Sequence, residues 1–147
     1  MIYRRSSWQN KIKSLKSLFL NYSGVRDVDL ARLVNLSALE ELNLDSCPIG
    51  DWAIAHLADN NVTPNLTSLD LADTDLTDNG MAHLPKFEQI TRLSLFYCNI
   101  SNVGLQYMAG MKNLEVLNLD SRDVSSENGK CFCIILKFRF KKFGLQT

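Results

Sequence analysis

The chain has 147 residues, of which 46% are hydrophobic and 22% are charged, with 16 basic and 16 acidic side chains. This is the composition of one ordinary globular domain, and it excludes a disordered chain of high net charge or a low-complexity chain, since only 7 Gly and 3 Pro are present. Four Cys in a chain of this length do not indicate a disulfide scaffold, and no apolar run approaches the roughly 18–20 residues that a membrane span needs.

The zero net charge conceals three segments of different charge. Residues 1–16 and 130–147 each carry five basic residues and no acidic one. The stretch 17–129 therefore holds the other 6 basic residues and all 16 acidic ones, a formal charge of −10. Because phosphate contacts need Lys and Arg, the acidic central stretch argues against nucleic acid as the main partner.

The amino terminus predicts an intracellular, cytoplasmic protein, with a nuclear location as the alternative. No apolar segment follows Arg4 and Arg5, so the first residues lack the pattern of a secretory signal peptide.

A Leu-x-x-Leu-x-Leu pattern recurs along the chain. Its five starting positions are Leu15, Leu39, Leu66, Ile90 and Leu114, and the spacings between them are 24, 27, 24 and 24 residues. Further apolar residues keep the same phase, ten, fifteen and eighteen residues after the starts. The three extra residues of the second unit are assigned to 58–64, which has the composition of a loop.

Each unit changes its hydrophobic period once. The Leu-x-Leu part alternates with the period of a short strand, and the later apolar pair, three residues apart, is typical of one side of a short helix. One unit cannot bury its own leucines, so neighbouring units must stack. The sequence predicts an α/β solenoid of about five 24-residue units, with parallel strands on the concave side and short helices on the convex side. The predicted organisation is a basic segment 1–14, a repeat domain 15–129 and a basic aromatic tail 130–147.

Two units carry a family resemblance most clearly. They begin Leu66-Thr-Ser-Leu-Asp-Leu and Ile90-Thr-Arg-Leu-Ser-Leu, and each continues through Thr74 or Cys98 to a Gly followed by Met or Leu. The pattern resembles the leucine-rich repeat over roughly residues 13–128, in particular the cysteine-containing subclass. That subclass is common in F-box substrate receptors of ubiquitin ligases and related recognition proteins. The resemblance implies a recognition solenoid, and it does not extend to an F-box segment.

No set of residues indicates catalysis or a bound cofactor. His56 and His83 both fall seventeen residues after a repeat start and are expected on the solvated convex surface rather than in a metal site. The segment 73–80 departs from calcium-loop spacing, because Asp78 stands where that loop needs Gly. The chain is therefore predicted to be a non-enzyme without a cofactor or metal.

The two cysteines within the repeats are predicted to be free, buried thiols. Cys47 and Cys98 occupy equivalent positions two units apart, about 10 Å, which exceeds the roughly 7 Å limit for Cα atoms of a disulfide. At that position, a small side chain is expected to hydrogen-bond to the backbone of the loop that leaves the strand.

The concave side is the predicted binding face. Side chains two, four, six and seven residues after each start point away from the core. They include an acidic centre with aromatic pairs on either side, and the predicted partner-binding residues are Phe19, Tyr22, Glu41, Asp45, Asp70, Asp73, Arg92, Phe96, Tyr97 and Asp120. Exposed aromatic residues beside charge are typical of protein interfaces, so the face is predicted to bind a protein, in particular a basic segment.

The tail departs from the repeat pattern. Leu136, Phe138 and Phe140 alternate with Lys137 and Arg139, which indicates one basic edge strand that caps the open end of the stack. The alternative is that the tail is no part of the evolved solenoid. With an open end, the chain is expected to be a monomer or to associate weakly end to end.

Two alternative functions stay open at this stage. In the first alternative, the repeats are the regulatory or recognition region of a larger protein, such as a ubiquitin-ligase substrate receptor. In the second, the basic ends of the chain associate with nucleic acid or a membrane.

Overall fold

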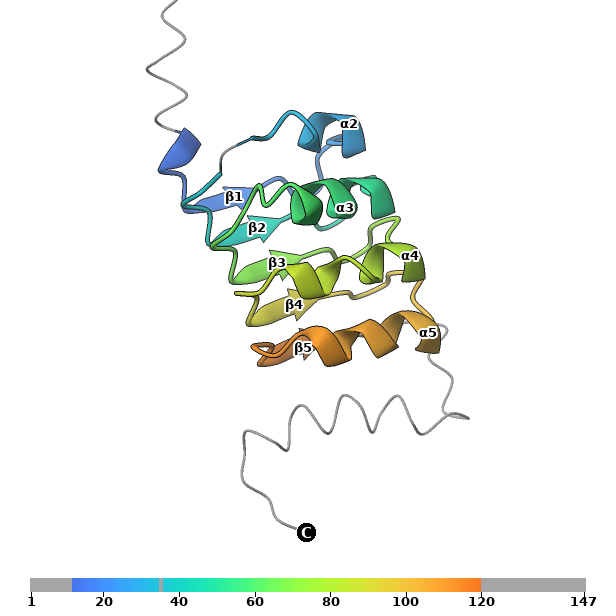
Figure 1. Ribbon diagram of the computed structural model, residues 1–147. Helices are drawn as coiled ribbons and strands as arrows, with labels where there is room; N and C mark the ends of the chain where they lie inside the picture. Colours follow the sequence, from blue (N-terminus) through green and yellow to red (C-terminus); the bar gives the residue numbers. More distant parts are fainter. Residues whose placement is uncertain (1–11, 35, 120–147) are drawn as a thin grey trace, which may run out of the picture.

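Five short parallel strands, one from each repeat, form a single sheet in the computed structural model, which describes residues 12–34 and 36–119 (Figure 1). The strands are β1 (Ser17–Phe19), β2 (Glu41–Asn43), β3 (Ser68–Asp70), β4 (Arg92–Ser94) and β5 (Val116–Asn118). Their order in the sheet is their order in the chain, so each unit pairs with the next one. The predicted tail 130–147 lies outside the described residues.

The repeat leucines lie in one row across the sheet. Leu42 pairs in register with Leu69, and Leu69 with Leu93, on adjoining parallel strands. All three side chains are nearly inaccessible, at 1, 1 and 2% exposure. This arrangement confirms the predicted stacking of units.

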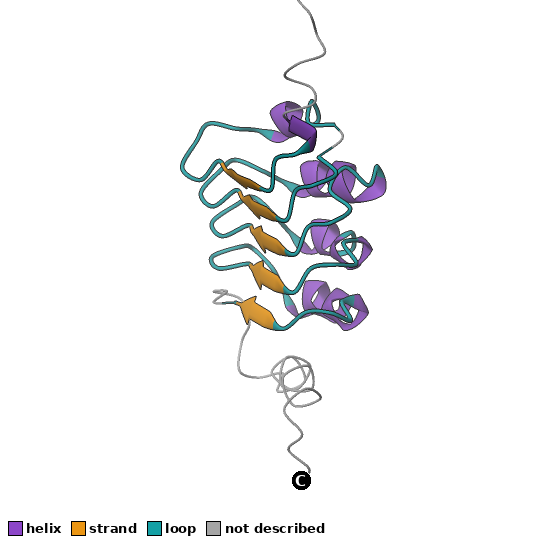
Figure 2. Ribbon diagram, turned by 90° about the vertical axis from the view of Figure 1, so that its left-hand side faces the viewer, coloured by secondary structure: helices purple, strands orange, loops and turns teal. Residues whose placement is uncertain are grey.

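Short helices follow the strands and cover one side of the sheet (Figure 2). They are α2 (Asp27–Leu30), α3 (Asp51–Asp59), α4 (Asp78–Met81) and α5 (Asn102–Leu105), together with the 3-10 helices η1 (Leu84–Lys86) and η2 (Gln106–Gly110). The side chains of Thr77 and Ser101 each accept a hydrogen bond from the backbone N–H two residues on, which caps α4 and α5. The other side of the sheet, hereafter the strand face, carries no helix among the described residues.

The core lies between the strands and the helices. Leu44, Leu71 and Leu95 contribute from the sheet, and Leu57 and Leu84 from the helical side, all fully buried. In the first and fifth units the equivalent leucines are only half-buried, because among the described residues a neighbouring unit covers them on one side alone. Those residues are Leu15, Leu18 and Leu20 in the first unit and Leu114, Leu117 and Leu119 in the fifth.

The long second unit differs from its prediction. The three extra residues were assigned to a loop at 58–64, but α3 continues to Asp59, so that prediction is wrong for Ala58 and Asp59. The chain then turns through Asn61, whose φ is +49°, and buries Val62 against the core. The reason is that α3 can be longer by a turn without disturbing the strands, so part of the insertion is accommodated as helix.

A row of carboxylates links each helix to the next unit. Asp51 accepts bonds from both the backbone N–H (2.8 Å) and the hydroxyl (2.6 Å) of Thr77, and Asp78 accepts the same two bonds from Ser101. A Cβ on Gly80 would lie 2.5 Å from Asp51 Oδ1, so glycine allows α4 to approach α3 closely. The helices are therefore held in register by side chains at their first turns.

We expect Leu69→Ala to lower the free energy of unfolding by about 2–5 kcal/mol, because it leaves a cavity in the middle of the leucine row. Urea unfolding followed by circular dichroism measures the change. Ser68→Ala, on the same strand, is the control and should stay within about 0.5 kcal/mol. A loss below about 1 kcal/mol for Leu69→Ala would contradict the packing described here.

Asp51→Ala should cost about 1.5–3 kcal/mol, since two donors on Thr77 lose a charged acceptor. Asp75→Ala removes the same charge from an exposed side chain and should change stability by less than about 0.5 kcal/mol. The two variants are compared by thermal and urea unfolding. Equal losses of stability in the two variants would show that the change in net charge, rather than the loss of the bonds to Thr77, lowers the stability.

Candidate functional site

The chain leaves each of the first four strands through the same unusual backbone conformation. The residues seven positions after the repeat starts have positive φ, namely Tyr22 (+55°), Ser46 (+54°), Asp73 (+48°) and Tyr97 (+58°). This left-handed region disfavours most side chains, and a bulky tyrosine is uncommon there. The repeated turn places these four side chains at the ends of successive strands.

Backbone hydrogen bonds tie these turns together. Tyr22 N donates to Asp45 O (2.9 Å), Ser46 N to Ala72 O (2.9 Å) and Asp73 N to Phe96 O (2.7 Å). The bonds continue the ladder of the sheet beyond the strands, so neighbouring turns lie about one strand spacing apart, or roughly 4.8 Å. We call this surface the strand-end rim, and it consists of Tyr22, Asp45, Ser46, Asp73, Phe96 and Tyr97.

Two carboxylates lie in the middle of the strand-end rim. The Ser46 hydroxyl lies 2.9 Å from Asp45 Oδ1 and 3.4 Å from Asp73 Oδ2, so it can donate to either carboxylate. Asp73 is exposed and Asp45 is half-buried. The rim therefore presents negative charge to solvent between its two aromatic ends.

Those ends are built from exposed rings. Tyr22 is 75% exposed at one end and Tyr97 48% at the other. Phe96 and Tyr97 meet edge to face, with ring centroids 4.2 Å apart and planes at 77°. Phe19, on the first strand, is also exposed, so the predicted aromatic residues do reach the surface of the strand face.

The centre of the sheet is occupied by polar groups that bond to one another. Asp70 Oδ1 accepts a bond from Ala72 N (3.1 Å), and Asp70 Oδ2 accepts one from Asn43 Nδ2 (3.4 Å). Asn43 Oδ1 in turn accepts a bond from Asp45 N (2.9 Å). Both oxygens of Asp70 thus stabilise the turns that follow β2 and β3.

The remaining predicted residues lie at the amino ends of the strands. Arg92 Nε donates to Ser68 Oγ (3.4 Å), and Glu41 Oε2 accepts from Ser17 Oγ (3.4 Å). Both are at the start of their strands, at the opposite end from the strand-end rim. Asp120 lies outside the described residues.

The two cysteines are free and buried, as predicted. Cys47 Sγ donates to Leu20 O and Cys98 Sγ to Leu71 O, each at 3.0 Å, which confirms the predicted bonds to the backbone of the turn. Burial raises the pKa of the Cys98 thiol, while its contact with Thr74 acts in the opposite direction. Such a thiol is a poor nucleophile at neutral pH.

The histidines lie on the helical side. His83 Nδ1 is 3.1 Å from Asp59 Oδ1, which also accepts a bond from Lys86; the lysine and then the histidine hold the pKa of Asp59 below its usual value. His56 stacks on Trp52, with ring centroids 5.6 Å apart. In residues 12–34 and 36–119, no three His, Cys, Asp or Glu side chains are grouped so that they could hold a metal ion.

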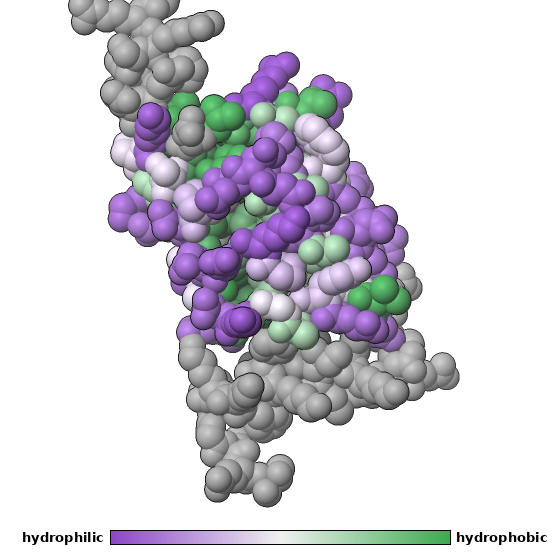
Figure 3. Space-filling view, viewed as in Figure 1, coloured by the Kyte–Doolittle hydropathy of each residue, from purple (hydrophilic) through white to green (hydrophobic). Residues whose placement is uncertain are grey.

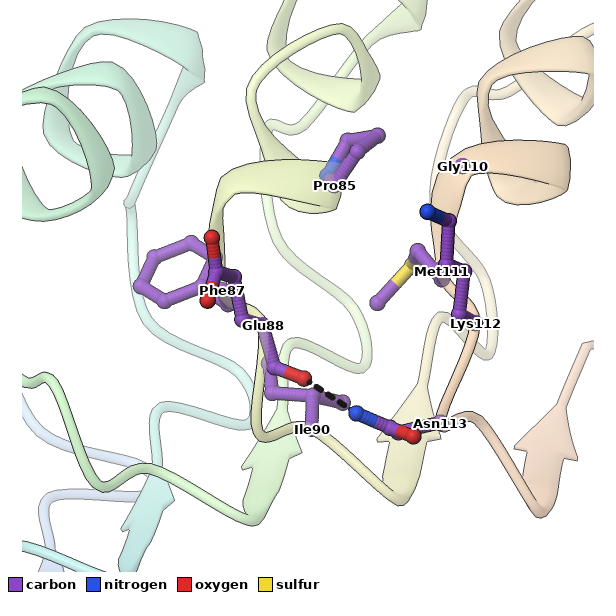
Figure 4. Close-up of a pocket in the computed structure, with 8 residues that line it drawn as sticks. All are labelled: Pro85, Phe87, Glu88, Ile90, Gly110, Met111, Lys112 and Asn113. Carbon is purple, nitrogen blue, oxygen red and sulfur yellow. Dashed lines mark hydrogen bonds between the residues drawn. The ribbon is translucent and has the colours of Figure 1, made fainter.

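A pocket of about 320 Å³ opens between the segments that lead into β4 and β5 (Figure 4). Met111 and Ile90 form buried apolar walls, and the exposed Glu88 and Lys112 lie on opposite sides of the opening. Asn113 Nδ2 donates to Glu88 O (2.8 Å) and closes one end. Sequence analysis missed this pocket, because it depends on how two irregular segments pack.

Hydrophilic side chains dominate the side of the molecule seen in Figure 3, interrupted by a few hydrophobic patches. On the helical side, the exposed large hydrophobic residues include Val28 and Trp52 (each 54% exposed) and Val103 (59%). No helix of the described residues has the length and apolar character needed to cross a membrane. The intracellular location stays a prediction.

The family model for the leucine-rich repeat matches residues 36–51, 62–84 and 90–109. No curated protein matches the chain significantly in sequence. These matches and the parallel five-stranded sheet show that the chain carries leucine-rich repeats and folds as a leucine-rich-repeat solenoid. The likeness to the repeats of F-box receptors stays a prediction.

Solved structures of the same fold include three from different proteins. Actin-binding site 2 of leiomodin-1 has a TM-score of 0.70 at 14% identity, covering 92% of this chain and 85% of that one. The tropomodulin C-terminal domain from Caenorhabditis elegans has a TM-score of 0.66 at 14% identity, covering 90% and 86%. An internalin from Listeria monocytogenes has a TM-score of 0.51 at 20% identity, covering 76% and 37%. At these identities the likeness concerns the fold.

The structure thus divides the predicted binding residues into two groups. Tyr22, Asp45, Asp73, Phe96 and Tyr97 come together along the strand-end rim, whereas the other described ones, Phe19, Glu41, Asp70 and Arg92, lie elsewhere on the strand face. Its position seven residues after a repeat start places Ser46 on the predicted face, but Ser46 was not among the predicted binding residues. In the structure its hydroxyl lies between two carboxylates.

The buried thiols give a measurable prediction. In a Cys131→Ser/Cys133→Ser background, iodoacetamide at pH 8 should modify Cys47 and Cys98 only as fast as the protein unfolds. Rapid labelling without urea would contradict the burial.

The raised pKa of the Cys98 thiol also predicts a pH dependence of stability. Because the folded pKa of Cys98 lies above the ordinary 9.0, the unfolded thiol loses its proton first, and the free energy of unfolding should decline as pH rises beyond about 9.

Proposed function

We propose that this chain is a protein-recognition module whose strand face binds a basic segment of a partner protein. The observation that carries the proposal is the arrangement of Asp45 and Asp73 between the exposed rings of Tyr22 and Tyr97. Tyrosine and tryptophan are enriched among the few residues that dominate binding energy in protein interfaces, and charge steers the encounter.

Two further features support recognition rather than another role. Within the described residues the strand face is not covered by helices, so a partner has access to it. The fold is shared with a domain of leiomodin-1 that is named as an actin-binding site, which is consistent with a solenoid that presents a protein-binding surface. The partner proposed here is defined by its positive charge.

The test is affinity capture from lysate, followed by mass spectrometry, with Asp45→Lys/Asp73→Lys compared against the unchanged chain. The double variant should capture at least tenfold less of the specific partner protein. It should keep its fold, because neither side chain belongs to the core. Glu40→Lys/Glu88→Lys makes the same change in charge near the amino ends of the strands and serves as the control. Equal capture by all three proteins would refute the proposed face.

A further inference from the structure

We infer that the partner segment runs along the strand-end rim, across the strands, and places two arginine side chains three residues apart in two aromatic–carboxylate corners. The inference rests on the proposed function and specifies the partner's chemistry and spacing. One corner is formed by Tyr22 and Asp45, and the other by Asp73 with Phe96 and Tyr97.

The rim, rather than the middle of the sheet, has carboxylates available for a partner. Both oxygens of Asp70 already accept hydrogen bonds from the chain itself, so its charge is committed to the fold. Asp45 and Asp73 each have one oxygen within reach of the Ser46 hydroxyl, at 2.9 and 3.4 Å, so that one donor serves both carboxylates. Asp73 is exposed and Asp45 is half-buried. At the amino end of β4, the exposed Arg92 repels a cationic segment from the opposite edge.

Each corner pairs an aromatic residue with an acidic residue on the neighbouring turn. The backbone N–H of Tyr22 donates to Asp45 O (2.9 Å) and that of Asp73 to Phe96 O (2.7 Å), so the two members of each pair leave adjoining turns. The edge-to-face pair of Phe96 and Tyr97 offers two surfaces at 77°. A planar guanidinium can stack on a ring while its edge pairs with a carboxylate, which an ammonium group cannot do as well. The corners therefore favour arginine over lysine.

The spacing of the corners sets the spacing of the arginines. One corner spans the first and second units and the other spans the third and fourth, so their centres lie two strand spacings apart, about 10 Å. A polyproline II segment advances about 9.3 Å in three residues and returns its side chains to the same side. In a β-strand, side chains on one side recur every second residue, about 6.6 Å apart, which is too short. The favoured ligand is Arg-x-x-Arg.

The backbone supports this assignment by holding the corners in place before binding. Tyr22 and Tyr97 occupy a backbone conformation that is unfavourable for a bulky residue, and bonds between neighbouring turns hold the backbone there. Rings that are already oriented lose less conformational entropy when a ligand stacks on them.

The test is an NMR titration of the full chain with the blocked peptide Gly-Arg-Pro-Pro-Arg-Gly. It should shift the amide signals of Tyr22, Ser46, Asp73 and Tyr97 saturably. Peptides with one or four prolines between the arginines should bind at least fivefold more weakly, and the lysine analogue at least threefold more weakly. Equal affinity for all spacings would overturn the inference.

Variants separate a specific site from general attraction. Tyr97→Ala removes a ring but no charge, and it should weaken the two-proline peptide about tenfold. Tyr107→Ala, which removes an exposed tyrosine from η2, is the matched control and should leave the affinity unchanged. Equal effects of the two variants would overturn the assignment of the corner.

The same measurements distinguish the two proposals. If no peptide shifts the rim signals but protein capture still depends on Asp45 and Asp73, the strand face binds a partner and the Arg-x-x-Arg inference is wrong. If no peptide binds and the amount of captured partner is the same with and without the two aspartates, the proposed function is wrong as well.

Discussion

Burial of the repeat leucines between successive units is the interaction on which the rest of the molecule depends. A strand of three residues cannot persist alone, and each unit exposes its leucines unless a neighbour covers them. Leu42, Leu69 and Leu93 are inaccessible because units stand on both sides of them, while Leu18 and Leu117, at the ends, are only half-buried. Stability is therefore shared along the stack.

The constraint on the leucines leaves other positions free to differ between units. Some of these positions stabilise the turns, and others vary without affecting the backbone. Four residues after the repeat starts, Asn43 and Asp70 bond to the backbone of the following turns and to each other. Two and three positions further on, the side chains vary from Asp45 and Ser46 to Phe96 and Tyr97 without a change in the ladder. The fold thus separates residues that hold the turn from residues that differ freely between units.

Sequence reasoning reached the fold because its main determinant is local and periodic. The spacing of Leu39, Leu66 and Ile90 determines which strands pair and in what register. It also placed the thiols of Cys47 and Cys98, since equivalent positions in a solenoid keep their environment.

The site was predicted less completely, for a physical reason. Whether a polar side chain bonds to the chain or remains available depends on hydrogen-bond geometry between units, which the repeat pattern does not specify. Asp70 and Asp73 look alike in the sequence, yet one has both oxygens engaged and the other is exposed. The positive φ of Tyr22 and Tyr97 was equally hidden, because aromatic residues do not signal that conformation.

The unusual turns depend on the stability of the stack beneath them. A tyrosine in the left-handed region is retained only when surrounding interactions exceed its conformational cost, and here these are the bonds from each turn to the next. The same bonds depend on the stacked leucines beneath them. We therefore expect a substitution in the core to disturb the rim although the substituted residue contacts no ligand. A substitution on the rim is expected to leave the leucine stack intact. In the proposed mode of recognition, substitutions along the rim would change affinity through side chains alone, while the spacing between the two corners would stay tied to the spacing of the strands.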